Sequence, residues 1–439
     1  MSLILGVVLV LGVMILVHEA GHFVVARLCG VRVDVFSIGF GPRLFGWKRG
    51  ATDYRVSAVP LGGYVRMAGQ DLSDVDRGKT AAPSGKPDEL LSKTRWQRAI
   101  IAFAGPAVNL ILPVVLLTAF FIVKGQPYPA YLDKPVQVLW PATGSPLQAG
   151  DRVVAINGVN DPTWEKAEAA ASTAGPGDTW HLTVENQGAR RSVDVPVKDA
   201  AQAMRVFGYP PIPPTIDEVV AGMPAYRAGL QPGDEIVALN GQRIGTWPQF
   251  VDLVKASGGK PLQVRVRRKD QETDVQLTPQ QMADDRGETV WMVGIQRRLQ
   301  MDYRSVGAGQ AIQFAVLDTA AGIDQVVNIV GRLFTGRVSV RQLQGVVGIA
   351  RESGQAVRQG PSSVINLMAL ISVNLGILNL LPIPILDGGH ILLLAIEGAM
   401  RRDLSLAFKE RFVQVGFVFL LVLFGIVMYN DVVRILPVR

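Results

Sequence analysis

Four stretches of this chain are apolar over the length that crosses a bilayer, and they constrain the fold more than any other feature. A membrane-spanning helix needs about 20 consecutive apolar residues, because in lipid the backbone must satisfy its own hydrogen bonds. Apolar residues make up 49% of the 439 residues and charged residues only 18%, against about 25% charged in soluble domains. We therefore expect a polytopic α-helical membrane protein, with four transmembrane helices at residues 3–26, 99–123, 362–386 and 412–430.

The distribution of basic residues predicts how these spans are oriented. The segment Arg27–Arg98 carries 13 Lys or Arg against 7 acidic residues, and residues 401–411 add four more basic residues. Because basic loops stay in the cytosol, we expect the termini and residues 124–358 on the outer side, which is the periplasm in a Gram-negative cell. The net charge of +7 then fits a lipid bilayer as partner and no nucleic acid. The first span begins without Lys or Arg, so we interpret it as a retained helix and not as a secretory signal.

An internal repeat divides the long stretch between the second and third spans. The twelve residues 147–158 recur as residues 230–241, at an offset of 83 residues. Each copy contains a Gly-Asp turn, a half-buried strand and an Asn-Gly turn, followed by a helix and alternating strands. A proline-rich segment at 209–214 reads as a stiff linker between the copies. The expected boundaries are 124–214 for a first β-rich domain, 215–300 for a second, and 301–358 for an amphipathic helix and connector lying on the membrane or on the β domains.

The repeated pattern resembles that of PDZ domains. The second copy, with Ala228-Gly229 before its Leu230, matches more closely than the first, which has Ser145-Pro146 at that place. PDZ-like domains bind an extended peptide by adding it as a strand to a sheet edge, so peptide ligands are expected partners. The alternative is a pair of rigid spacers that only limit access to the membrane.

The first span contains ionisable residues that a lipid-facing helix would exclude. Two of the four histidines lie in the sequence His18-Glu19-Ala20-Gly21-His22. Positions four apart share one face of a helix, so both imidazoles can bind one zinc ion. Glu19 lies about 100° round the helix, where its carboxylate can take a proton from water beside the metal. Two histidines satisfied by hydrogen bonds in a bundle are the alternative, but a Glu inside a span is costly enough to favour a functional site.

A catalytic zinc site with two histidines normally takes a third protein ligand. Asp387 ends the third uncharged run, and the first and third spans both run from the outside inward. His18 lies about 22 Å along the first span, so the two motifs should meet in the cytosolic half of the membrane. His390 is a rival ligand, whereas His181 belongs to the first β-rich domain on the other side.

Two prolines, Pro382 and Pro384, interrupt the third span just before Asp387, because proline removes a backbone donor and bars helix continuation. Broken backbone at membrane depth is tolerated where it lines a wet cavity, which suits hydrolysis. Asn374 and Asn379 could hold a substrate chain unwound from its helix, or they could only join neighbouring helices.

In combination, HEAGH in the first span, NLLPIPILDGGH in the third and the PDZ-like pair between spans two and three resemble the site-2 protease family of intramembrane metalloproteases. The resemblance covers essentially the whole chain. It implies that His18, His22 and Asp387 bind one catalytic zinc ion and that Glu19 is the general base. It also implies a set of substrate-binding positions: Asn374, Asn379, Pro382, Pro384, Gly39 and Gly41.

Two further segments match the family. Gly39-Phe40-Gly41 and the strands that follow, through Gly62-Gly63-Tyr64, resemble a membrane re-entrant hairpin that receives substrate as an extra strand. The segment Phe103–Asn109 matches the family's motif in the second span, where close helix packing and a direct role are equally open readings.

The function implied by the resemblance is regulated intramembrane proteolysis in the bacterial inner membrane. The substrates would be single-span membrane proteins, such as an anti-sigma factor already trimmed by another protease, and possible remnant signal peptides. The PDZ pair would act as a size filter. Signal-peptide remnants or peptide pheromones as the main substrates remain an alternative. A non-catalytic zinc-containing PDZ scaffold is disfavoured by Glu19, and a zinc transporter is disfavoured because the ligands form one cluster.

Overall fold

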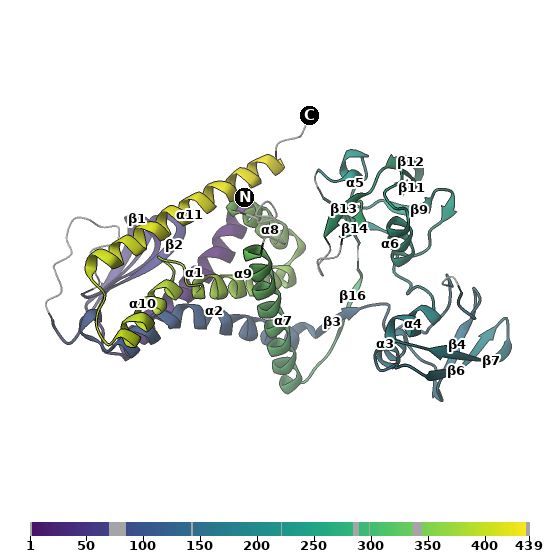
Figure 1. Ribbon diagram of the computed structural model, residues 1–439, viewed down its shortest axis with the longest axis horizontal. Helices are drawn as coiled ribbons and strands as arrows, with labels where there is room; N and C mark the ends of the chain where they lie inside the picture. Colours follow the sequence, from purple (N-terminus) through teal and green to yellow (C-terminus); the bar gives the residue numbers. More distant parts are fainter. Residues whose placement is uncertain are drawn as a thin grey trace. The chain divides into compact units, whose positions relative to one another are not determined.

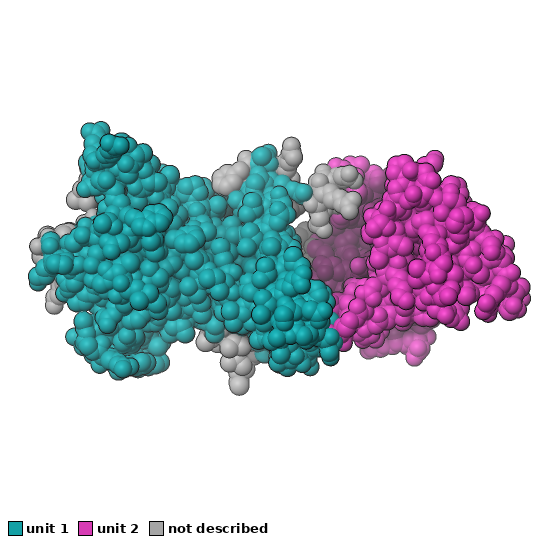
Figure 2. Space-filling view, turned by 90° about the horizontal axis from the view of Figure 1, so that it is seen from below, with its two compact units in different colours: residues 1–126, 305–437 teal, residues 127–304, 438–439 magenta. Residues whose placement is uncertain are grey.

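The computed structural model describes residues 2–69, 85–141, 144–220, 222–283, 289–297, 299–335 and 345–435. The chain folds into two compact units (Figure 2). Unit 1 is formed by residues 1–126 and 305–437, and unit 2 by residues 127–304. Unit 1 contains every candidate membrane helix found among the described residues, and unit 2 is rich in strands. A β-rich region is therefore inserted between membrane helices, as expected.

Unit 1 is a bundle of long helices (Figure 1). Five helices within the described residues are long and apolar enough to cross a membrane, one more than the four expected, so the number of spans stays a prediction. The fifth candidate is α7, in the segment expected to be an amphipathic helix. The helices are α1 (Ser2–Leu28), α2 (Arg95–Lys124), α7 (Ala308–Phe334), α8 (Val346–Gln359), α9 (Pro361–Leu380), α10 (Asp387–Met400) and α11 (Leu406–Ile435), and a 3-10 turn η1 (Leu90–Ser92) precedes α2.

Helix α7 packs against its neighbours in unit 1. Near its start Ala311 and Ala315 are fully buried against the aromatic end of α2, where Phe120 and Phe121 lie. Further along, Val326 joins residues of α9 in a second apolar cluster. We expected this helix to lie on the membrane or on the β domains. Its buried side chains form part of the core between α2 and α9, and its contact with a membrane stays a prediction.

Helix α9 ends six residues earlier than the expected end of the third span. Leu381 has extended backbone angles, because a residue that precedes proline is sterically excluded from the helical region. The loop 381–386 that follows contains Pro382 and Pro384, and a new helix, α10, begins at Asp387. The first turn of α10 rests directly on this loop: a Cβ on Gly388 would lie 2.3 Å from the carbonyl oxygen of Leu381.

The segment between α1 and α2 forms a curled antiparallel sheet from β1 (Val33–Arg49) and β2 (Thr52–Met67). Residues 35–38 pair with residues 63–66 along one edge and with residues 53–56 along the other. The rest of β1 continues the sheet beside the second of these segments. The expected hairpin is therefore a sheet of four segments, and the segment 63–66 lies at one of its outer edges.

Unit 2 contains two four-stranded sheets with the same topology, β5-β4-β6-β7 and β10-β9-β11-β12. They follow the sequence repeat. Asn157 and Asn240 begin the two Asn-Gly turns with φ of 46° and 48°, as a two-residue hairpin turn of this type requires. The first half has β3 (Gln126–Pro129), β4 (Arg152–Ile156), β5 (Val159–Asn160), α3 (Trp164–Ser172), β6 (Asp178–Asn186), β7 (Ala189–Val197) and α4 (Ala200–Val206). The second half has β8 (Ile216–Val219), α5 (Pro224–Arg227), β9 (Glu235–Leu239), β10 (Gln242–Arg243), α6 (Trp247–Ala256), β11 (Leu262–Arg268), β12 (Gln271–Leu277), β13 (Gln280–Ala283), β14 (Thr289–Met292) and β15 (Ile295–Arg297). The last strand, β16 (Met301–Arg304), pairs with β3 in a separate two-stranded sheet.

The proline-rich segment 209–214 belongs to the second half of unit 2. Ile212 is buried in the core of that half. The carbonyl oxygens of Ile212 and Pro214 accept hydrogen bonds from the backbone N–H groups of Trp247 and Ile236. We expected a stiff linker, and the structure shows a segment whose backbone is hydrogen-bonded into the fold.

Candidate metal centre

The structure brings together His18, His22 and Asp387, which lie 369 positions apart in the sequence at their most distant. The two histidines project from one face of α1, and Asp387 is the first residue of α10. Both histidines are buried. Their donor atoms and a carboxylate oxygen of Asp387 all lie within 4.8 Å of one another. Among the described residues this is the one group of three or more His, Cys, Asp or Glu side chains close enough to hold a metal ion.

The spacing of the donor atoms fits zinc. The Nε2 atoms of His18 and His22 are 3.2 Å apart. Nε2 of His18 is 3.2 Å from Oδ2 of Asp387, and Nε2 of His22 is 3.4 Å from Oδ1. Ligand atoms at 2.0–2.1 Å from a tetrahedral zinc ion are separated by about 3.3–3.4 Å. Two imidazoles and one carboxylate are also a known catalytic zinc donor set, which leaves one position for water or substrate.

Helix α2 supports this group through the segment Phe103–Asn109, whose role the sequence left open. A Cβ on Gly105 would lie 2.2 Å from Nε2 of His22, so only glycine leaves room for this imidazole. The other ring nitrogen of His22 lies 2.8 Å from the carbonyl oxygen of Ile101. Asn109 is fully buried, and its Nδ2 is 3.1 Å from Nδ1 of His18. Both imidazoles are therefore held by α2 through the nitrogen that faces away from Asp387.

Glu19 lies beside the group and against the edge of the β1–β2 sheet. It is half-buried, and its carboxylate interacts with the backbone of Val65. A Cβ on Gly63 would lie 2.9 Å from Cγ of Glu19, so glycine at this position lets the sheet edge approach the carboxylate. Sequence reasoning named the segment around Gly63 without identifying this contact, because a strand position does not reveal which helix residue it will face.

The residues expected to handle substrate lie at several places around unit 1. Asn374 and Asn379 are half-buried on α9, and within the described residues their side chains make no hydrogen bonds. Pro382 and Pro384 form the loop before Asp387. Gly39 and Gly41, with φ of 90° and 84°, lie where β1 bends away from its first pairing. Their part in substrate binding stays a prediction.

The remaining histidines lie outside the three-residue group. His390, the rival ligand, is exposed on α10. His181 belongs to β6 of unit 2, where its ring lies 2.7 Å from an oxygen of Asp194. Neither joins a group that could hold a metal ion among the residues that the structure describes.

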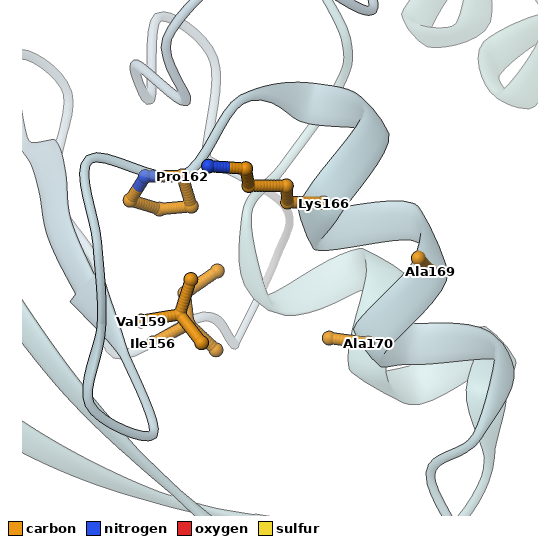
Figure 3. Close-up of a pocket in the computed structure, with 6 residues that line it drawn as sticks. All are labelled: Ile156, Val159, Pro162, Lys166, Ala169 and Ala170. Atoms are coloured by element: carbon orange, nitrogen blue, oxygen red, sulfur yellow. The ribbon is translucent and has the colours of Figure 1, made fainter.

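Unit 2 has a pocket of about 210 Å³ between the β4–β5 turn and helix α3 (Figure 3). Its lining is apolar apart from the side chain of Lys166. It includes no carboxylate, histidine or cysteine and therefore offers no metal ligand. The residues that line it are Ile156, Val159, Pro162, Lys166, Ala169 and Ala170.

Comparison with known proteins gives matches over nearly the whole chain. The family model described as peptidase family M50 matches residues 6–423. The regulator of sigma-E protease RseP of Escherichia coli strain K12 is 33% identical over 449 residues, which cover 98% of each chain. Protease RseP of Yersinia pestis is 32% identical over 451 residues, again with 98% of each chain covered. A Vibrio cholerae protein that bears the name of a zinc metalloprotease is 31% identical over 450 residues, with the same coverage.

Proposed function

Because this chain belongs to peptidase family M50, the site-2 proteases, and is a zinc metalloprotease, we propose that it cuts single-span membrane proteins within the bilayer. The observation that carries this proposal is the spacing of the three donor atoms beside Glu19. His18, His22 and Asp387 would hold one zinc ion, and Glu19 would act as the general base. A non-catalytic scaffold has no use for a carboxylate held next to such a group, and a transporter would place its ligands at successive sites across the membrane instead of in one cluster.

The residues around the group would divide the work of peptide hydrolysis. A bound zinc ion would polarise water and the scissile carbonyl group. The Glu19 carboxylate takes a proton from the attacking water and passes it to the leaving amine nitrogen. The backbone of Val65 and the glycine at position 63 keep this carboxylate at the sheet edge, where a substrate backbone can approach it.

The sheet edge at residues 63–66 would receive the substrate as an extra strand. Within the described part of the sheet this segment pairs with residues 35–38 on one side only, so a substrate strand would be added along its other, outer edge. An extended chain is what a protease needs, because a helix buries its carbonyl groups in intrahelical hydrogen bonds. Gly39 and Gly41 would allow the bend in β1, and Asn374, Asn379, Pro382 and Pro384 would hold the unwound substrate chain.

We further propose substrates of the kind that the relatives' names indicate. The name of the E. coli relative, a regulator of sigma-E protease, supports a trimmed anti-sigma factor as substrate, and remnant signal peptides remain a second substrate class. The PDZ-like halves of unit 2 would exclude substrates with intact outer domains. The relatives and the apolar helices support an inner-membrane location, with the termini and unit 2 in the periplasm and the metal centre towards the cytosolic half.

The test is cleavage of a single-span model substrate by the purified full-length protein in proteoliposomes. Wild type and Glu19→Gln are compared, zinc is quantified in both, and the substrate is offered with and without a folded outer domain. We expect wild type to cut only the trimmed substrate, and Glu19→Gln to retain zinc while its cleavage rate falls by about 10²–10⁴-fold, the typical contribution of a general base.

Each part of the proposal has its own contradicting outcome. Cleavage by Glu19→Gln at the wild-type rate would remove Glu19 from the chemistry. Absence of zinc from the active wild type would remove the metal centre. Equal cleavage of trimmed and untrimmed substrates would remove the size filter and leave the protease assignment in place.

A further inference from the structure

Proline at position 113 leaves a buried carbonyl group of α2 without its helical partner. In an α-helix the N–H of residue i+4 donates to the carbonyl oxygen of residue i. The residue at position 113 would therefore donate its N–H to the carbonyl oxygen of Asn109, but proline has no N–H. Asn109 and Pro113 are both buried, so water does not replace the missing donor.

Helix α9 supplies that donor. The hydroxyl Oγ of Ser372 donates to the carbonyl oxygen of Asn109 at 2.7 Å, and Ser372 is fully buried. One turn further along α9, Gly376 allows the close approach: a Cβ there would lie 2.8 Å from the side chain of Leu110 and 3.2 Å from the carbonyl oxygen of Pro106. A hydrogen bond therefore joins the backbone of Asn109 to α9, because α2 itself provides no helical donor for the Asn109 carbonyl oxygen.

The side chain of Asn109 faces His18 from the side opposite to Asp387. Its Nδ2 is 3.1 Å from Nδ1 of His18, and its Oδ1 is buried without a hydrogen-bond partner among the described residues. A neutral imidazole that binds metal through Nε2 carries its proton on Nδ1, and this N–H needs an acceptor. A half-turn of the amide about its Cβ–Cγ bond presents Oδ1 to that proton.

We propose that Asn109 is a positioning residue for the metal centre. Its amide oxygen accepts the Nδ1–H of His18 and so directs Nε2 towards His22 and Asp387, while Ser372 holds Asn109 in place across the gap that Pro113 leaves. This inference rests on the proposed function, since it assumes a metal ion between His18, His22 and Asp387. Two hydrogen bonds, from Ser372 on α9 to Asn109 on α2 and between Asn109 and His18 on α1, would make the orientation of His18 depend on how the three helices pack.

The first test measures metal retention in the full-length protein and does not depend on cleavage. Zinc content and the rate of zinc loss to excess chelator are measured for wild type, Asn109→Leu and Asn109→Asp. Asn109→Leu keeps the size of the side chain but removes the acceptor, and we expect its zinc affinity to fall by about 10–100-fold, the usual effect of losing such a partner. Asn109→Asp retains an acceptor and should stay within a few-fold of wild type.

The second test uses the proline. Ser372→Ala removes the only donor to the Asn109 carbonyl oxygen that the described residues provide, and zinc loss should become several-fold faster. In the double variant Ser372→Ala/Pro113→Ala the backbone N–H of Ala returns as donor, so the slow zinc loss should be recovered. Ser353→Ala is the matched control, because Ser353 is also a fully buried serine but its hydroxyl has no hydrogen-bond partner among the described residues.

The visible absorption spectrum of the Co²⁺-substituted protein reports ligand geometry independently of affinity. We expect the tetrahedral bands of wild type to be kept in Asn109→Asp and in the double variant, and altered in Asn109→Leu. Wild-type zinc retention and spectrum in Asn109→Leu would overturn the inference and leave the protease proposal intact. A double variant no better than Ser372→Ala would overturn the role of Pro113 and Ser372. A wild-type protein that holds no metal would instead overturn the proposed metal centre.

Discussion

Carboxylates of the two units, buried in unit 2 and half-buried at Asp387 in unit 1, differ in their partners. In unit 2, Asp151 is 0% and Asp234 1% exposed. Each aspartate ends a Gly-Asp turn. Its carboxylate accepts a hydrogen bond from the backbone N–H of the residue three positions earlier and pairs with an arginine. In unit 1, the carboxylate of Asp387 faces two imidazole nitrogens at 3.2 Å and 3.4 Å.

The difference separates a structural carboxylate from one that we propose binds a metal ion. An arginine and a backbone amide supply a full positive charge and fixed donors, so Asp151 and Asp234 are satisfied by the fold itself. The nitrogens facing Asp387 can act as electron-pair donors towards a common point, and three donors converging in this way are stabilised by a cation between them. The identity of the partners therefore distinguishes the two cases.

A buried carboxylate in unit 1 can also be structural. Asp431, near the end of α11, accepts hydrogen bonds from the backbone N–H groups of Gly345, Val347 and Gly348 at the start of α8. A carboxylate at a helix N-terminus satisfies amides that have no partner within the helix. Asp431 therefore provides an internal reference for Asp387 within the same unit.

The largest expected effect comes from Asp387→Asn, which keeps the size of the side chain and removes its charge. We expect zinc content to fall to background and the cleavage rate to fall by more than about 100-fold. Even the loss of a group that only hydrogen-bonds to a metal ligand lowers metal affinity by about 10–100-fold. Asp431→Asn in the same unit should keep its zinc. Zinc and cleavage are measured on the same preparations. Retention of zinc by Asp387→Asn would break the distinction drawn between the two kinds of carboxylate.

A smaller loss of zinc affinity is expected when a side chain on α2 fills the space that the His22 imidazole occupies. Gly105→Ala places a methyl group where Nε2 of His22 now approaches to 2.2 Å of the ideal Cβ position, so the ring must move and zinc affinity should fall by about 10–100-fold. Gly12→Ala is the control, because nothing lies within 4 Å of a Cβ at that helical position. Zinc loss to a chelator measures the difference. Equal rates for the two variants would contradict the observed packing of α2 on His22.

In unit 2 the same kind of substitution should change stability and leave the metal untouched. Asp234→Asn removes the charge that pairs with Arg268 and weakens the bond to the N–H of Gln231. We expect a loss of about 1–3 kcal/mol in the stability of the second half, the range for an unsatisfied buried group. Hydrogen exchange of β9 and β11 in the full-length protein measures this loss. A fall in zinc content would show that Asp234 is not purely structural.

The smallest effect is the acid sensitivity of the first half of unit 2. Burial by itself raises the pKa of Asp151, but hydrogen bonds from Gln148, Asn186 and Arg191, together with the charge of Arg191, bring it below its ordinary value. A depressed pKa contributes stability that is fully present above about pH 4, the value for an unfolded Asp, and that is lost as the pH falls through the folded pKa. The hydrogen-exchange protection of β4 and β6, relative to the intrinsic exchange rate at each pH, should therefore fall at acid pH, and fall less in Asp151→Asn. Identical acid profiles for the two proteins would contradict this account.

Several features of the site follow from sequence alone because they are local. The HEAGH spacing places His18 and His22 on one helical face regardless of what surrounds the helix. The Pro382 and Pro384 pair ends α9 whatever its neighbours are, because it acts on backbone donors and on the preceding residue. The topology of the spans also indicated that Asp387 would come near the histidines, and the structure places it there.

Other features could not be read from the sequence. The positions of Asn109 and Gly105 on α2 depend on how that helix is rotated about its axis against α1. The sheet of four segments depends on β1 pairing along both edges, and the alternation of side chains in β1 is the same whether one edge or two are used. The partners of α7 likewise depend on packing, since one apolar stripe can cover lipid, a domain or other helices.

The sequence by itself thus determined the class of protein, the inserted repeat, the zinc motif and the break before Asp387. Each of these depends on distances of a few residues along the chain, where covalent geometry and backbone sterics leave few choices. The tertiary structure decided which groups complete the site. These are the α2 residues that contact the imidazoles, the sheet edge beside Glu19, and the α9 serine that donates a hydrogen bond to the carbonyl oxygen of Asn109. These contacts join residues up to 263 positions apart, and they are selected by the packing of whole helices, which no local pattern encodes.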